Sequence, residues 1–237
     1  MAKQILKTLS LTSALTVTAV LGTVSSQSFA MSPFQAGYQF SYNGKNIGSA
    51  TRTLAKSGNN WSYAFVAKAV GLASATETSK FTLNNGQISS TSFSRTSKVL
   101  VHNNTMSINF NPSTKLINTK KDDKTRSFAW RAGVLDELNA ELQLREDLKK
   151  GTLKSNYYLA DAKEIEARKF VKQGTETVKT PYGTFDTVKV VMKHDKPGRE
   201  TIFWLAPKLD YTPVKMSHLD GKTSYGLLLS GYKGPTS

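Results

Sequence analysis

Beyond residue 30, hydrophobic and polar positions alternate with a period of two, the pattern of a strand with one buried face. The first row of alternate apolar side chains is Phe34, Ala36, Tyr38, Phe40 and Tyr42. The dipeptide Asn43-Gly44 follows, and it tolerates the positive φ angles of a tight hairpin. These positions predict an antiparallel pair of strands with an aromatic stripe on one face.

The same pattern recurs along the chain. A second alternating row consists of Trp61, Tyr63, Phe65, Ala67 and Ala69. Turn signals return about every ten residues, which favours an antiparallel meander. One such turn is expected at Asn84-Asn85-Gly86, and another at His102-Asn103-Asn104. Later strands are expected over 154–160, 163–173, 175–180, 184–193, 199–206, 211–219 and 223–231.

The period changes once, near the middle of the chain. Leu135, Leu138, Leu142 and Leu148 have helical spacing, and charged residues such as Glu141, Arg145 and Glu146 lie largely off that stripe. Acidic residues come first, Lys149 and Lys150 come last, and Gly151 follows, an order that suits the helix dipole and a glycine cap. A helix is therefore expected over about 134–150.

Together these elements predict a mainly β protein. So many strands must curl, split into two layers or close. We expect a strongly curved antiparallel sheet or open barrel, with the central helix on its concave side, in a single domain over 31–237. A small outer-membrane β-barrel is the alternative, although strands in the middle of the chain carry lysine and arginine on both faces.

Residues 1–30 have the features of a secretory signal peptide. Lys3 and Lys7 precede an uncharged, largely apolar stretch, and the small residues Ser28 and Ala30 precede a plausible cut before Met31. The other interpretation, a transmembrane anchor, is weakened by the many Thr and Ser residues in that stretch. Export to the periplasm is the expectation, and no transmembrane helix is expected in the mature chain.

The amino-acid composition excludes several kinds of functional site. The 237 residues include no cysteine, so disulfides, thiolate metal sites and cysteine nucleophiles are excluded. The formal net charge is +15. For an exported protein this excess favours anionic lipid, lipopolysaccharide or wall polymers over nucleic acid. Scattered lysines that maintain solubility and protect sheet edges are the simpler interpretation.

No catalytic motif stands out. The three histidines lack the paired spacing of metal ligands, so no metal or cofactor is expected. Glu164 and Glu166 would share one strand face, His194 fits a turn and His218 lies in a strand. These four residues are the candidates if the protein is instead an envelope hydrolase acting on wall glycan or lipid.

The C-terminal half resembles a known family. Residues 176–190 fit E-x-V-x-T-P-x-G-x-F-x-x-x-x-V, and residues 201–215 fit x-x-x-W-x-A-P-x-x-x-x-x-P-V-K. Together with Tyr38, Phe40, Gly44 and Gly48 in the opening hairpin, they resemble the exported bacterial family called domain of unknown function 3108. The resemblance implies a β-rich envelope protein of a Gram-negative bacterium and brings no catalytic residues.

The function expected from these observations is non-enzymatic. The curved sheet would bind a lipid or another amphipathic or anionic envelope ligand, or would dock another envelope protein. The candidate ligand-binding residues are the aromatic side chains of the two rows and one later tryptophan, namely Tyr38, Phe40, Tyr42, Trp61, Tyr63, Phe65 and Trp204. The same aromatic side chains would equally suit a protein core.

Overall fold

The computed structural model describes residues 31–71, 73–100 and 102–236. The expected signal peptide and Ala30 lie outside the described residues. Met31, which follows the expected cut, is described, and its side chain is buried. Within the described residues, no helix has the length and hydropathy of a membrane span.

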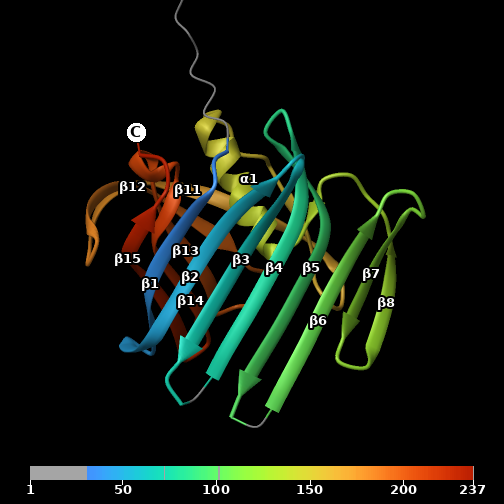
Figure 1. Ribbon diagram of the computed structural model, residues 1–237, viewed down its shortest axis with the longest axis horizontal. Coiled ribbons are helices and arrows are strands. Elements are labelled where there is room, and N and C mark those ends of the chain that lie inside the picture. Colours follow the sequence, from blue (N-terminus) through green and yellow to red (C-terminus); the bar gives the residue numbers. More distant parts are fainter. Residues whose placement is uncertain (1–30, 72, 101, 237) are drawn as a thin grey trace, which may run out of the picture.

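Fifteen strands form one sheet, with one α-helix and a short 3-10 helix (Figure 1). The first eight strands are β1 (Phe34–Tyr42), β2 (Lys45–Ser57), β3 (Asn60–Ala69), β4 (Ala73–Asn84), β5 (Gln87–Val99), β6 (His102–Asn111), β7 (Leu116–Lys121) and β8 (Lys124–Ala129). The next elements are β9 (Val134–Leu135), α1 (Glu137–Lys149), β10 (Tyr157–Ala160), β11 (Ile165–Thr180) and β12 (Gly183–Lys193). The chain ends with β13 (Arg199–Ala206), η1 (Pro207–Leu209), β14 (Thr212–Asp220) and β15 (Thr223–Lys233).

The sheet is a meander joined to itself at one place. The order is β8-β7-β6-β5-β4-β3-β2-β1-β15-β14-β13-β12-β11-β10-β9. Strands that are consecutive in the chain are therefore neighbours, except β8 and β9, and β1 pairs with β15. The β9–β10 pair is parallel, whereas the other ladders are antiparallel. The prediction of a large, curved and mainly antiparallel sheet is confirmed.

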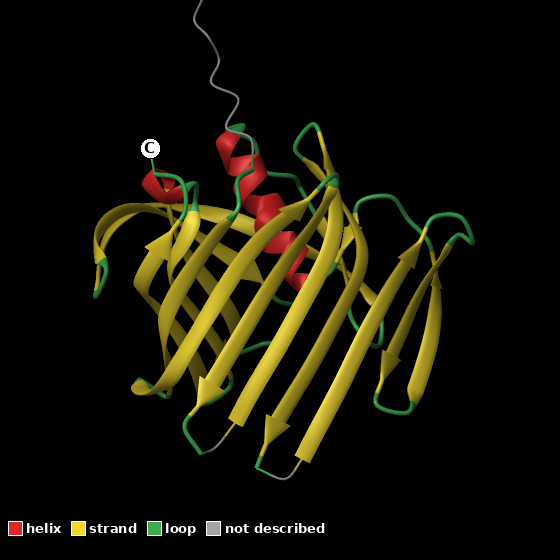
Figure 2. Ribbon diagram, in the orientation of Figure 1, coloured by secondary structure: helices red, strands yellow, loops and turns green. Residues whose placement is uncertain are grey.

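The sheet curls around α1. Figures 1 and 2 show β1–β8 in front, β11–β14 behind, and the helix between these two walls near one end. Most of the hydrophobic core lies between the helix and the two walls, and it includes Tyr38, Tyr63, Phe81, Leu142 and Val190. The prediction of a helix on the concave side is therefore confirmed.

The sheet is open rather than closed. Its edge strands β8 and β9 do not pair with each other in the described part of the chain. Side chains cross the gap instead, because Thr119 Oγ1 and Arg126 Nη1 both donate to the carbonyl oxygen of Ala162, each at 3.1 Å. A closed ladder, which the alternative of an outer-membrane barrel requires, is not present among these strands.

The helix differs from its prediction in two respects. Val134 and Leu135 belong to β9, where they pair with Tyr158 and Leu159, so the helix begins later than position 134. Its polar face is also buried. Glu141, Arg145 and Glu146 lie off the leucine stripe, yet each is at most 5% exposed. A helix enclosed by a curled sheet has no solvent side, so its polar side chains must find partners in the sheet.

The hairpin turns follow their sequence signals in most places. Asn43-Gly44 and Asn85-Gly86 each have two positive φ angles, as predicted. The prediction of a turn at His102-Asn103-Asn104 is wrong, because these residues begin β6. The chain turns earlier instead, and Leu100 has a φ of 54°.

Candidate functional site

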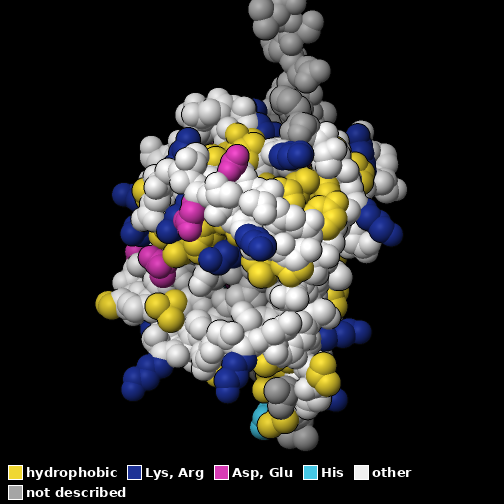
Figure 3. Space-filling model, turned by 90° about the vertical axis from the view of Figure 1, so that its left-hand side faces the viewer, with side chains coloured by type: hydrophobic (Ala, Val, Ile, Leu, Met, Phe, Trp, Pro, Cys, Tyr) yellow, Lys and Arg dark blue, Asp and Glu magenta, His cyan; other side chains and the backbone are white. Residues whose placement is uncertain are grey.

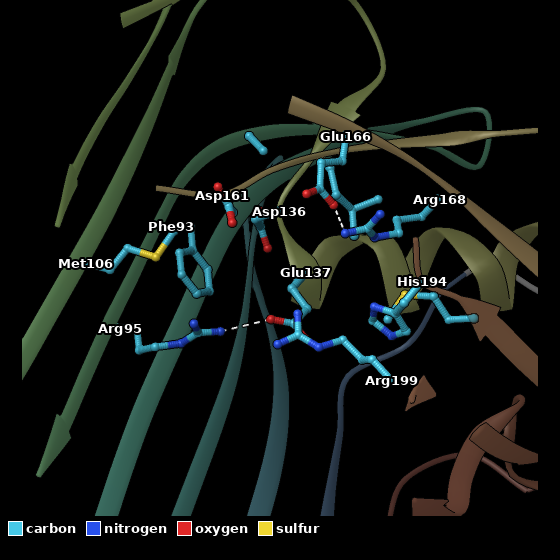
Figure 4. Close-up of a pocket in the computed structure, with 13 residues that line it drawn as sticks. Phe93, Arg95, Met106, Asp136, Glu137, Asp161, Glu166, Arg168, His194 and Arg199 are labelled. Atoms are coloured by element: carbon cyan, nitrogen blue, oxygen red, sulfur yellow. Dashed lines mark hydrogen bonds and ion pairs between the residues drawn. The ribbon is translucent and has the colours of Figure 1, made fainter. Parts of the chain in front are cut away.

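A cleft lies between the two walls of the sheet at the N-terminal end of α1. It consists of two cavities of about 130 and 140 Å³, called here the first and second cavity. Both are lined by Arg95, Glu137 and Met192, so they adjoin one another. Figure 4 shows the first cavity.

Asp136 fixes the N-terminal end of α1, which borders this cleft. It is the N-cap of α1, and its carboxylate accepts from Asn139 N at 3.0 Å and from Ser90 Oγ at 3.1 Å. It also accepts from Ser79 Oγ. Burial raises the pKa of Asp136 to about 6, although these hydrogen bonds act in the opposite direction. The N-cap thereby attaches the helix to β4 and β5.

Apolar side chains form much of both cavities. The first cavity is lined by Phe93, Met106, Leu159, Ala160 and Met192. The second cavity is lined by Phe65, Leu138, Phe170, Met192, Phe203 and Met216. These residues come from both walls and the helix, because the inward positions of facing strands converge where the sheet curls. The cleft therefore offers an apolar interior to a ligand.

The arginines of the cleft are paired with carboxylates. Arg95 donates to Glu77 at 2.6 Å and to Glu137 at 2.9 Å. Arg168 pairs with Glu166 and, at 3.2 Å, with Asp195, and Arg199 pairs with Asp220 at 2.5 Å. Figure 4 marks the Arg95–Glu137 and Arg168–Glu166 pairs.

The first cavity has no excess of positive charge. Its lining includes three arginines and four carboxylic side chains. The positive charge of the chain is therefore located elsewhere on the molecule.

A buried network borders the second cavity. Arg52 Nη1 donates to Tyr63 Oη at 2.9 Å and to Glu141, and Tyr63 Oη donates to Glu141 Oε1 at 2.8 Å. Burial alone would lower the pKa of Arg52, but the adjacent Glu141 carboxylate raises it, so the guanidinium stays charged. Arg52 Nε has no hydrogen-bond partner within the described residues.

Two histidines meet at the wall of the cleft. His194 Nε2 lies 2.9 Å and His218 Nδ1 lies 2.8 Å from Thr201 Oγ1. Burial, followed by the charge of Arg168, lowers the pKa of His194 to about 4. Burial also lowers the pKa of His218. Both imidazoles are therefore neutral near pH 7. The sequence gives His194 and His218 no visible relation. The β13–β14 pairing places His218 opposite Thr201, and the β12–β13 pairing brings His194, which follows the end of β12, to the same hydroxyl.

The candidate aromatic residues lie at different places. Six of them occupy alternate positions of β1 and β3, but they are staggered across β2, because Tyr38 is level with Ala67 and Tyr63 is level with Phe34. Tyr38, Trp61 and Tyr63 are buried, and Tyr38 Oη donates to Pro213 O at 2.9 Å. Phe65 lines the second cavity. Phe40 and Tyr42 lie against Tyr225 and are more exposed.

Trp204 lies on the other face of the sheet. It pairs with Lys189 and Lys215 across the ladder, and the two Nζ atoms lie 5.4 and 4.2 Å from its ring centroid. Its indole N–H donates to Glu176 at 2.9 Å. Trp204 is thus separated from the six inward-facing aromatic residues.

The two candidate glutamates are also separated. Glu166 lines the first cavity and pairs with Arg168. Glu164 is exposed in the turn before β11, where its backbone N–H donates to Asp161 Oδ1 at 3.0 Å. The arginines of the cleft were not predicted as site residues. The two partners of Arg95, for example, lie 18 and 42 positions away along the chain, and no local sequence pattern indicates pairs that are so far apart.

Comparison with known proteins gives a family and a fold. The model of a family described as "Protein of unknown function (DUF3108)" matches residues 37–226. The chain is similar to a solved structure from Brucella abortus, a β-barrel-like protein of domain of unknown function DUF1849. The TM-score is 0.57 at 12% identity, over 87% of this chain and 99% of that one. A search of curated proteins finds no match.

Proposed function

This chain belongs to the DUF3108 family of proteins of unknown function, and from the geometry of its cleft we propose that it binds an amphipathic molecule without transforming it. The observation that carries the proposal is the pair of adjoining cavities with apolar walls inside a curled sheet. Ligand sites in proteins are typically concave and mostly apolar, with a few convergent polar groups.

The size of the cleft restricts the ligand. Each cavity is smaller than the roughly 300–1,000 Å³ of common ligand pockets, so each suits a chain segment rather than a bulky ring system. Phe40, Tyr42 and Tyr225 continue the inner face beyond the cleft and are partly exposed. An acyl chain that enters the cleft would extend along these rings.

The polar end of the ligand would meet paired groups. Arg95 and Arg168 already bind carboxylates, so the cleft offers donors and acceptors without a net positive charge. Recognition of a headgroup would then depend on hydrogen bonds. The unpartnered Nε of Arg52 supplies one further buried donor at the second cavity.

The test is ligand binding with a blocked cleft. Native mass spectrometry of the purified protein should show bound lipid, and a fluorescent fatty acid should bind and be displaced by phospholipid or lipopolysaccharide. Met192→Trp fills the space shared by both cavities and should abolish binding. Val171→Trp adds the same ring at a residue that is 40% exposed and should leave binding unchanged. Absence of any bound lipid in the unaltered protein would refute the proposal.

We also propose that the protein works in the periplasm. The support is the sequence of residues 1–30, which has the features of a signal peptide. Osmotic shock of expressing cells should release the protein without detergent, shortened by these thirty residues. Retention of the full-length chain in the cytoplasm would contradict this location.

A second candidate function is hydrolysis of an envelope lipid or glycan. It is favoured by Thr201, whose hydroxyl lies between two neutral imidazoles at the cleft wall, since a hydroxyl beside a base is the basic arrangement of nucleophilic catalysis. Turnover of a phospholipid or peptidoglycan substrate that is lost in Thr201→Val and His218→Ala would establish it. Absence of turnover by the unaltered protein would exclude hydrolysis. Loss of turnover in Glu166→Gln, with Thr201→Val still active, would instead assign catalysis to the carboxylate.

A further inference from the structure

Two neighbouring hairpins expose hydrophobic residues at their tips. Val70, at the β3–β4 turn, is 85% exposed, and Leu100, at the β5–β6 turn, is 62% exposed. The hairpins are adjacent because β4 pairs with β5, with Ala73 opposite Val99. Val99 is itself 51% exposed. An exposed apolar group of this kind marks an interaction site when charged or polar residues surround it.

The conformation of Leu100 is unfavourable for its side chain. Its φ of 54° lies in the left-handed region, where Asn and Gly are favoured and bulky residues are rare. The tight hairpins at Asn43-Gly44 and Asn85-Gly86 follow that preference, although Lys115 and Tyr211 also have positive φ angles. The fold gains nothing visible from a leucine here, so the leucine requires another explanation.

Lysines lie directly behind these tips. Lys68 precedes Val70 by two residues, and Lys98 precedes Leu100 by two. Both lysines lie directly opposite Ser74 of β4, one on each side of that strand. Lys45 follows the neighbouring β1–β2 turn. The described residues of the three tips, which are 42–46, 68–71, 73–74, 98–100 and 102–104, include no carboxylate. At this end of the sheet, acidic residues appear in the turns on either side, at Asp122 and Asp123 between β7 and β8 and at Asp220 between β14 and β15.

We propose that this tip surface, consisting of Lys45, Lys68, Val70, Lys98, Val99 and Leu100, docks onto an anionic lipid membrane. Two strand residues span about 7 Å. The apolar tips would therefore enter the boundary between headgroups and acyl chains, which amphipathic segments penetrate by about 5–10 Å, while the lysines stay at the phosphates. The proposal does not depend on what the cleft binds.

The arrangement favours a membrane over a protein partner. Stable protein interfaces need a broad, well-packed patch of about 800 Å² on each side. Here the apolar groups are a few side chains at the ends of separate hairpins, in a basic setting that complements anionic headgroups. Figure 3 shows Lys and Arg side chains around the lower border of one face of the molecule, and hydrophobic side chains with a His near its lower end.

The first test places a reporter at the tip. The chain has no cysteine, so Val70→Cys can be labelled at one site with a polarity-sensitive dye. Its emission should shift to the blue with vesicles of phosphatidylcholine mixed with phosphatidylglycerol, and much less with phosphatidylcholine alone. Leu116→Cys, at the start of β7 and the opposite end of the sheet, is the control and should not shift. An equal shift at both positions, or none at Val70, would overturn the proposal.

The second test removes the interacting groups without harming the fold. Leu100→Asn suits the left-handed conformation, and combined with Val70→Ser it should abolish sedimentation with anionic vesicles while the thermal midpoint stays the same or rises. Lys68→Gln with Lys98→Gln should weaken binding about fivefold for each lysine, and added salt should weaken binding of the unaltered protein. Leu116→Ser and Lys56→Gln with Lys80→Gln are the matched controls.

The outcomes separate the explanations. Binding that survives the tip variants, or that is lost equally in the controls, would show that another surface carries it. No sedimentation of the unaltered protein with anionic vesicles would refute membrane docking and leave the tips for a protein partner. Loss confined to the tip variants would support the proposal.

Discussion

At the scale of single residues, burial decides how the ionisable groups around α1 behave. Asp136 is fully buried, and two serines and an asparagine donate hydrogen bonds to its carboxyl group. These three side chains replace the water molecules that would surround an exposed carboxylate. Its pKa is raised to about 6 because burial outweighs those donors. The two histidines at Thr201 show the opposite sign for the same reason, since burial opposes charge in acids and bases alike.

Asp136 should make stability depend on pH. A folded pKa of about 6, above the usual 3.8, contributes stability that is fully present below pH 3.8 and is lost as the pH rises through about 6. The loss amounts to about 3 kcal/mol. In Asp136→Asn this contribution should be absent, so the free energy of unfolding should change less between pH 4 and pH 7. Urea unfolding at both pH values measures it, and an equal change in both proteins would contradict the assignment.

Gly48 is required for its lack of a side chain. A Cβ at this position would lie 1.8 Å from the carbonyl oxygen of Lys68, a backbone atom that cannot move aside alone. Gly48→Ala should therefore destabilise the fold by about 3 kcal/mol or more. Gly231→Ala is the matched control in a strand, because its Cβ would meet nothing within 4 Å, and it should change stability by less than about 0.5 kcal/mol. Similar denaturation midpoints for both variants would refute the explanation.

At the scale of elements, the strands were easier to predict than the surroundings of the helix. Alternation and Asn-Gly turns depend on neighbouring residues, so β1, β3 and the turns at Asn43-Gly44 and Asn85-Gly86 could be inferred from local sequence. The β5–β6 turn could not, because it breaks the usual turn chemistry and uses Leu100. The polar face of α1 was misleading for a tertiary reason: Gln143, Arg145 and Asp147 are hydrogen-bonded to side chains and backbone of other segments.

The link between α1 and β2 can be measured by a double-mutant cycle. Arg52→Met or Glu141→Leu alone leaves a buried charge unpaired, and each should destabilise the protein by about 3–5 kcal/mol. The double variant should lose much less than the sum, because it removes both charges. Urea unfolding of the four proteins gives the coupling free energy. Additive losses would show that Arg52 and Glu141 are stabilised independently.

At the scale of the whole molecule, most of the sheet order could be predicted, but the parallel β9–β10 ladder and the β1–β15 ladder could not. A meander follows from short turns between consecutive strands, whereas the pairing of Gln35 with Lys233 joins residues from opposite ends of the chain. The cleft depends on that ladder, because it brings the wall formed by β1–β5 to face the wall formed by β11–β14. The arginine pairs and the histidine pair therefore could not be inferred from local patterns.

The β1–β15 ladder predicts that the chain tolerates a new order of its strands. Residues 31 and 236 flank neighbouring strands, so a short linker can join them, and new ends can be made between Asp122 and Asp123 in an exposed turn. This permuted protein should unfold cooperatively, within about 2 kcal/mol of the original. Opening the chain inside β2, between Gly48 and Ser49, should prevent folding. A permuted protein that opens at 122–123 and aggregates would contradict the prediction.

The β1–β15 ladder also determines when the sheet can be completed during synthesis. During synthesis β1 is made before the other described strands and β15 after them, so one edge of β1 has no partner strand until β15 exists. Hairpins can form early because their loops are short, but the curled sheet cannot be completed around α1 before the final strand arrives. The curled sheet therefore remains incomplete, and one edge of β1 stays available to other strands, until β15 has been made.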